Sequence, residues 1–347
     1  MEEPTGEWHG DAEQEARAAQ VAAARARFGA LVRRPDREIN VAEAALLIAA
    51  EEYPGLDVEA YLSKLEALAA RVRARMAAGT GGSAADPDEV ALQALHTVLF
   101  QEEGFRGSDP EHYYSARNSM LNEVIDRRRG LPITLSIVYC EVARRAGLEA
   151  AGIGLPYHFI AQFRGQHLSV YVDPFNGGKR LSIEECAAVA SRARGAPVEL
   201  APEHLQPASN KQILARLLGN LKGVYLQRGQ LMKALAATER ILVVSPAIEQ
   251  VRDRGLILRA LGDQLLQAAA RAVQQAEAAG DPEAPSPAPE QMQLLLQAQQ
   301  ANHQSVTLLA PAWFDLKLYA RLAEGASDAA EAAEAAESLW RRMARHN

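Results

Sequence analysis

A cysteine, a histidine and an acid follow one another in the middle of the chain as Cys140, His158 and Asp173. Thiol catalysis uses these residue types, because a thiolate attacks, an imidazole within hydrogen-bond reach moves the proton, and a carboxylate orients the imidazole. The same imidazole and carboxylate can act on a hydroxyl, so Thr134 is a further candidate nucleophile. These residue types therefore suggest acyl transfer or hydrolysis.

These residues lie in a segment that predicts one helix followed by short strands. Pro132 suits the first turn of a helix that runs to Arg145, because the first turn leaves its N–H groups unbonded and proline has none. Three apolar runs bounded by Gly, Pro and Asn then indicate strands: 151–155, 158–164 and 168–172. We expect a small antiparallel sheet with His158 and Asp173 in hydrogen-bond contact across neighbouring strands.

The stretch 118–182 contains several motifs in order, namely NSMLNEVIDRRRGLPITLS, LPYHF and DPFNGG. It is preceded by AEAALLIAAEEYPGLD and LFQEEGFRGSDPEHYY and followed by NLKGVYLQRGQLMKAL. On these motifs the chain strongly resembles the bacterial SirB-one family over roughly residues 35–265. The resemblance implies a transglutaminase-like (papain-like) core followed by tetratricopeptide repeats.

The resemblance also implies that the core is degenerate. Transglutaminase-like relatives place a reactive cysteine at the start of a helix, where the helix dipole lowers the pKa of the thiol. That position maps onto Pro132, whereas His158 and Asp173 map onto the base and its orienting acid. Tyr157 stands where the family pattern usually has glycine, and we expect this bulky phenol to crowd the old cleft.

Cys140 is a poor substitute for the missing nucleophile. It lies eight residues beyond Pro132, about 12 Å along a helix with a rise of about 1.5 Å per residue, whereas proton transfer needs roughly 3 Å. Its neighbours Val138 and Tyr139 are apolar, which favours a buried structural thiol. Thr134 is closer to the helix start, but its hydroxyl needs activation by the histidine and the acid.

After Pro207 the periodicity is purely helical, and two separate helices are expected over 291–309 and 313–322. Gly229 recurs as Gly262, an interval close to the 34 residues of tetratricopeptide repeats. Further template positions of the first repeat are filled by Tyr225, Ala234 and Pro246. The second copy matches less well.

The expected fold class is α+β, a degenerate transglutaminase-like core with a small antiparallel sheet, followed by all-α repeats. We expect a helical or flexible lead-in over 1–35, the transglutaminase-like domain over 36–207 and the repeat-like helical domain over 208–347.

Composition narrows the range of partners. The 347 residues include 37 Lys and Arg against 44 Asp and Glu, a net charge of -7, whereas nucleic-acid binders usually carry a basic face. No nucleic-acid partner is therefore expected.

The two cysteines and the scattered histidines show no metal-ligand or redox spacing, so no metal or cofactor is expected. The N-terminus is acidic and no apolar run approaches the roughly 20 residues of a membrane span. A cytoplasmic protein is expected.

Two functions remain open at this point. The first is a non-enzymatic interaction protein that binds a protein or peptide through its helical repeats, whose stacking forms a concave surface. The second is a cysteine-independent hydrolase or amidase in which His158 and Asp173 act with Thr134 or a bound water. A Thr134 hydroxyl within about 3.5 Å of His158 in an open cleft would favour the enzyme.

Overall fold

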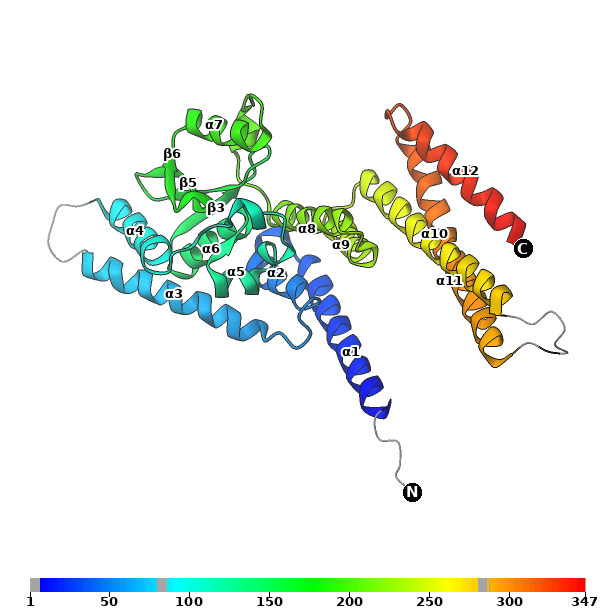
Figure 1. Ribbon diagram of the computed structural model, residues 1–347. Coiled ribbons are helices and arrows are strands. Elements are labelled where there is room, and N and C mark those ends of the chain that lie inside the picture. Colours follow the sequence, from blue (N-terminus) through cyan, green and yellow to red (C-terminus); the bar gives the residue numbers. More distant parts are fainter. Residues whose placement is uncertain (1–6, 80–85, 280–285, 287, 347) are drawn as a thin grey trace, which may run out of the picture. The chain divides into compact units, whose positions relative to one another are not determined.

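The computed structural model describes residues 7–79, 86–279, 286 and 288–346 (Figure 1). No helix in these stretches is both long enough and apolar enough to cross a membrane. Contacts divide the chain into two compact units, Met1–Asn220 and Leu221–Asn347. The division falls inside α8 (Asn210–Gln227), so the first turns of this helix belong with the N-terminal unit.

Helices form nearly the first half of the N-terminal unit. They are α1 (Glu7–Val32), α2 (Val41–Ala49), α3 (Val58–Gly79) and α4 (Pro87–His96), and a π-helical turn (Thr97–Glu102) continues α4. Asp57 caps the start of α3, since its carboxylate accepts the N–H of Ala60 at 2.9 Å.

Two further helices lead to the sheet, α5 (Leu121–Arg127) and α6 (Pro132–Arg145). α6 begins at Pro132 and ends at Arg145, as predicted from the proline and the apolar face. Eleven of its residues are buried, including Tyr139, whose side chain is fully enclosed. α6 therefore forms a central element of the unit.

The sheet has four antiparallel strands in the order β3–β4–β5–β6. Their bounds are β3 (Glu149–Ile153), β4 (Ile160–Arg164), β5 (Ser169–Asp173) and β6 (Lys179–Leu181). α6 contacts β3 and β4, and α7 (Ile183–Arg194) contributes Cys186 and Val189 to a buried cluster with Ile153 and Ile160. The expected small antiparallel sheet is confirmed, whereas β6 and a separate two-residue parallel pair were not predicted. That pair is β1 (Arg106–Gly107) with β2 (Arg129–Gly130).

The C-terminal unit contains only helices in its described residues, as expected. After α8 come α9 (Leu231–Val244), α10 (Ile248–Ala279), α11 (Pro289–Leu322) and α12 (Ala329–His346). The prediction of a break between residues 309 and 313 is wrong, because α11 runs through Pro311. α11 packs along α10, and this long shared face holds it helical at the proline.

The two repeat glycines have different surroundings. Gly229 has a φ of +67° and lies in the turn between α8 and α9, as a repeat predicts. Gly262 lies inside α10, where an added Cβ would come within 2.5 Å of the Leu309 side chain. Its small size serves close packing of α10 against α11, so no turn occurs at the second copy.

Two glycines in the turn between β5 and β6 allow a test of how this turn packs against the Phe100 ring. Gly177 and Gly178 both have positive φ, +66° and +78°, which suits glycine. An added Cβ at Gly178 would lie 2.2 Å from the Phe100 ring, whereas at Gly177 it would meet no atom within 4 Å. We expect Gly177→Ala to lower the free energy of unfolding by about 1–2 kcal/mol through backbone strain alone. Gly178→Ala adds overpacking and should cost about 2–4 kcal/mol in all. Urea unfolding measures both, and equal losses would contradict the packing of Phe100.

Candidate active site

Asp173 is the last residue of β5, and its carboxylate is fully buried. Oδ1 accepts the backbone N–H groups of Phe175 at 3.0 Å and Asn176 at 3.3 Å, and Oδ2 accepts the Asn176 side-chain amide at 2.7 Å. An aspartate followed by Pro-Phe-Asn forms this kind of turn because its side chain bonds the backbone two and three residues ahead. The local sequence thus fixes the direction of the carboxylate.

His158 lies two residues before β4 and is 7% exposed. Its Nε2 atom is 3.2 Å from Asp173 Oδ2, so the contact expected from the sequence is present. The imidazole also meets the Phe175 ring edge-on, with the ring centres 6.0 Å apart. The turn after Asp173 therefore supports the imidazole as well as the carboxylate.

The protonation of this pair follows from the Asp173 environment. Burial alone would raise the pKa of Asp173, but hydrogen bonds from His158 and Asn176 outweigh it and hold the pKa below the ordinary value of 3.8. An ionised carboxylate can only accept, so Nε2 of His158 carries the proton. The Nδ1 atom is then the basic nitrogen of the neutral ring, and no hydrogen bond to it occurs among the described residues. The arrangement can accept a proton through Nδ1.

Arg216 on α8 holds the loop that precedes β4. Its guanidinium donates to the carbonyl oxygen of Leu155 at 2.9 Å and to that of His158 at 2.7 Å. The same group lies over the Phe159 ring, 5.4 Å from its centre, and burial lowers the pKa of Arg216. Sequence reasoning missed this residue. The sequence signal that could have revealed it is an arginine beside the apolar residues Leu214 and Leu217 in a predicted helix.

Tyr157 does not fill the site. Its side chain is 59% exposed, and the Arg194 guanidinium lies 5.6 Å from its ring centre. The expectation that Tyr157 crowds the cleft is therefore wrong. Its backbone has a φ of +61°, a left-handed conformation that glycine adopts without strain.

The start of α6 carries Pro132, at the position where the nucleophile was expected, and Thr134, the candidate hydroxyl nucleophile. Pro132 occupies the first helical position and is buried. The Thr134 hydroxyl is fully buried, donates to the Asn118 carbonyl at 2.9 Å and accepts the N–H of Leu131 at 2.9 Å. No hydrogen bond joins Thr134 to His158 in the described part of the chain. The hydroxyl is engaged with the backbone.

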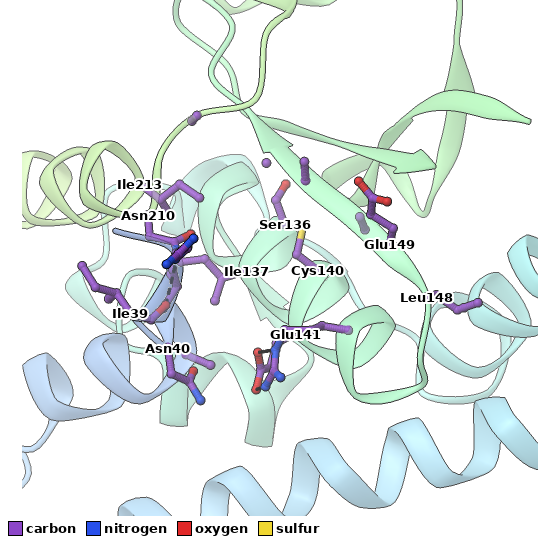
Figure 2. Close-up of a pocket in the computed structure, with 18 of the residues that line it drawn as sticks. Ile39, Asn40, Ser136, Ile137, Cys140, Glu141, Leu148, Glu149, Asn210 and Ile213 are labelled. Carbon is purple, nitrogen blue, oxygen red and sulfur yellow. Dashed lines mark hydrogen bonds and ion pairs between the residues drawn. The ribbon is translucent and has the colours of Figure 1, made fainter. Parts of the chain in front are cut away.

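No hydrogen bond joins Cys140 to His158 or Asp173 among the described residues. Cys140 is partly exposed to a cavity of about 570 Å³ whose lining does not include His158 or Asp173 (Figure 2). Burial raises the pKa of the Cys140 thiol to about 12, with a further contribution from the adjacent Glu141 carboxylate. Across the described ranges, no cluster of three or more His, Cys, Asp or Glu side chains is arranged to hold a metal ion.

Comparison with known proteins identifies relatives of this region. A sequence profile of the transglutaminase-like superfamily matches residues 59–219, which include His158, Asp173 and Arg216. A UPF0162 protein of Xylella fastidiosa (strain Temecula1) is 36% identical over 236 residues, covering 65% of this chain and 80% of the relative. A UPF0162 protein of Pseudomonas aeruginosa is 30% identical over 207 residues, covering 59% and 72%.

A more distant similarity extends to animals. The human F-box only protein 21 is 29% identical over 151 residues, which make up 40% of this chain and 22% of that protein. No solved structure matches the chain.

The buried carboxylate provides a pH test. Because the folded-state pKa of Asp173 lies below its ordinary value, the ionised group stabilises the fold above about pH 4, and this contribution is lost as the pH falls through the folded-state pKa. We expect Asp173→Asn to lower the free energy of unfolding by about 1–3 kcal/mol at pH 7, with a deficit that shrinks below about pH 4. Urea unfolding of both proteins across this range measures the deficit.

The matched control is Asp109→Asn, since Asp109 is exposed. We expect this change to stay within about 0.5 kcal/mol at every pH. An Asp173→Asn deficit that is the same at pH 3 and pH 7 would show that the ionised form is not the one stabilised.

Proposed function

This chain belongs to the UPF0162 family and contains a transglutaminase-like domain, and from that premise we propose that it is a non-enzymatic interaction protein whose domain has lost its nucleophile. The observation that carries the proposal is Pro132 at the first position of α6. This is where the resemblance to the SirB-one family places the reactive cysteine of active relatives. A proline has no group that attacks a carbonyl carbon.

The other two candidate nucleophiles, the Cys140 thiol and the Thr134 hydroxyl, are both poorly disposed to react, which supports the proposal. With a pKa of about 12, the Cys140 thiol is ionised in only about one molecule in 10⁵ at pH 7. The Thr134 hydroxyl donates its proton to the Asn118 carbonyl, so activation would require breaking a buried hydrogen bond. His158 and Asp173 are then a residual pair, whose contact joins the loop before β4 to the end of β5.

The C-terminal unit supplies the partner-binding surface in this proposal. The turn at Gly229 agrees with one tetratricopeptide-like repeat, and repeat helices present concave surfaces to peptides and proteins. Large apolar side chains are exposed on this unit: Met232, Leu256, Leu296, Phe314, Leu322 and Trp340. Exposed apolar groups of this size favour a protein partner over nucleic acid. The two free cysteines suit a reducing cytoplasm.

A second candidate function is a cysteine-independent hydrolase or amidase. The observation that favours it is the intact contact between His158 and Asp173, with no hydrogen bond to Nδ1 of His158 among the described residues. In such an enzyme Nδ1 takes a proton from water as the water oxygen attacks an acyl carbon, and the protonated imidazole then gives that proton to the leaving amine or alcohol as its bond to the acyl carbon breaks. Activity lost in His158→Ala and retained in Cys140→Ala would favour this function over the first.

Restoring the nucleophile tests the main proposal. We expect the unaltered protein to react negligibly with iodoacetamide at pH 7, because burial keeps both thiols protonated, with pKa values of about 12 for Cys140 and about 11 for Cys186. In a Cys140→Ala background, Pro132→Cys places a thiol at a helix start, where its pKa should fall below about 8.5. Mass spectrometry of labelling rates from pH 5 to 9 measures that pKa.

The control is Cys140→Ala alone, which we expect to leave binding of a partner by the C-terminal helices unchanged. Iodoacetamide labelling at Cys140 that abolishes an activity of the unaltered protein would overturn the non-enzymatic proposal. Failure of Pro132→Cys to label faster than the background would show that this helix start does not activate a thiol.

A further inference from the structure

β3 forms one edge of the four-stranded sheet, and no strand lies beyond it in the described chain. Its outer side is covered at one end only, by an isolated antiparallel bridge between Ile153 and Pro207. There the N–H of Ala208 donates to the carbonyl of Gly152 at 2.9 Å. The chain then leaves the edge to enter α8 at Asn210.

The register shows which backbone groups of β3 point away from the sheet. Gly165 donates to the Leu168 carbonyl in the β4–β5 hairpin at 2.7 Å, so the odd-numbered residues of β4 bond toward β5 and the even-numbered ones toward β3. β3 residues paired with the even-numbered ones therefore bond inward: Glu149, Ala151 and Ile153. The outward bond of Gly152 to Ala208 agrees with this alternation. The N–H and C=O of Ala150 and the N–H of Gly152 point outward, and no hydrogen bond to them occurs among the described residues.

The cavity of about 570 Å³ runs beside this edge. Figure 2 shows Ser136 and Cys140 on the side of α6 turned toward β3, with Asn210 and Ile213 to one side and Glu149 to the other. The lining combines Leu148 and the β3 residues 149–152 with apolar groups from other elements: Ile39 before α2, Ala42 on α2, Ile137 on α6, Phe159 before β4 and Ile213 on α8. The edge therefore adjoins a partly apolar hollow within the size range of ligand sites.

From these contacts we propose that the free edge of β3 binds an extended peptide segment of a partner protein by strand addition. The outward N–H and C=O of Ala150 bond its main chain, and the cavity beside α6 takes alternate side chains. Main-chain bonds give affinity in this mode, and pockets for every second side chain give selectivity. The small side chains of Ala150 and Ala151 leave the edge accessible to another backbone.

The chain's own segment at Pro207 supports an extended backbone as the occupant. It already pairs with the same edge at Ile153, in the antiparallel sense, and ends where the cavity begins. A guest strand of about four residues, about 13 Å at about 3.3 Å per residue, would continue along the stretch 148–151. A compact small molecule would leave the outward groups of Ala150 unpaired, which an extended peptide does not.

This inference goes beyond the proposed function. The cavity lining includes neither His158 nor Asp173, and all of it lies in the N-terminal unit. Peptide binding at β3 is therefore independent of whether the pair is catalytic and of partner binding by the C-terminal helices. The two proposals fail separately.

The test uses hydrogen exchange of the full chain with three capped tetrapeptides, Ala-Val-Ala-Val and its Glu-first and Lys-first versions. We expect saturable slowing of exchange at the Ala150 amide by at least one of them, with no change at Ala151, whose amide already bonds β4. The same peptide methylated on its central amide nitrogens cannot donate to β3 and should bind at least about tenfold more weakly.

The variant pair is Ala150→Pro, which removes the outward donor, and Ala150→Ser, which keeps it. We expect about a tenfold loss of affinity in the first and none in the second. The methylated peptide keeps the test decisive if the proline variant fails to fold. Equal binding of methylated and unmethylated peptides, slowing confined to the C-terminal unit, or no saturable slowing with any of the three would each overturn the proposal.

Discussion

The buried Asp173 carboxylate is the constraint on which the rest of the site depends. It receives hydrogen bonds from two backbone N–H groups, one side-chain amide and the His158 imidazole. Removing the acceptor would leave the buried His158 imidazole without this partner, at about 1–3 kcal/mol, and would release the turn that the other donors hold. One ionised side chain thus ends β5, shapes the turn that follows it and sets the tautomer of the imidazole.

The loop that carries the imidazole is held from the opposite direction. Arg216 bonds two of its carbonyl oxygens, and the helix that contains Arg216 begins at a cap formed by Asp36, whose carboxylate accepts the N–H groups of Asn210 and Lys211. The position of His158 therefore depends on residues from near the chain start to α8. The bond between His158 and Asp173 is buried and the bonds around it are partly buried, so packing and hydrogen bonding hold the pair in place. Its geometry needs no reaction to explain it.

Local signals predicted some of these features and long-range contacts decided the others. The bounds of α6 follow from Pro132 and a continuous apolar face, and the contact of His158 with Asp173 follows from the order of strands and turns. Nothing local reveals that Arg216 reaches a loop some 60 residues earlier. Likewise α11 continues through Pro311 because α10 packs beside it, and Gly262 resembled a turn although its surroundings make it a packing residue. These outcomes depend on neighbours far away in sequence.

Cys140 illustrates how one physical condition can remove one role and favour another. Removal of water raises its pKa to about 12, so the sulfur stays a neutral thiol. A neutral thiol is a poor nucleophile but a small, polarisable group that packs well against hydrocarbon. Together with Ile137 it lines the hollow beside β3, whose wall also carries the charged side chains of Glu141, Arg144 and Glu149. In the strand addition proposed for this edge, the neutral thiol would contact side chains of the guest by packing, whereas a thiolate would demand a compensating charge.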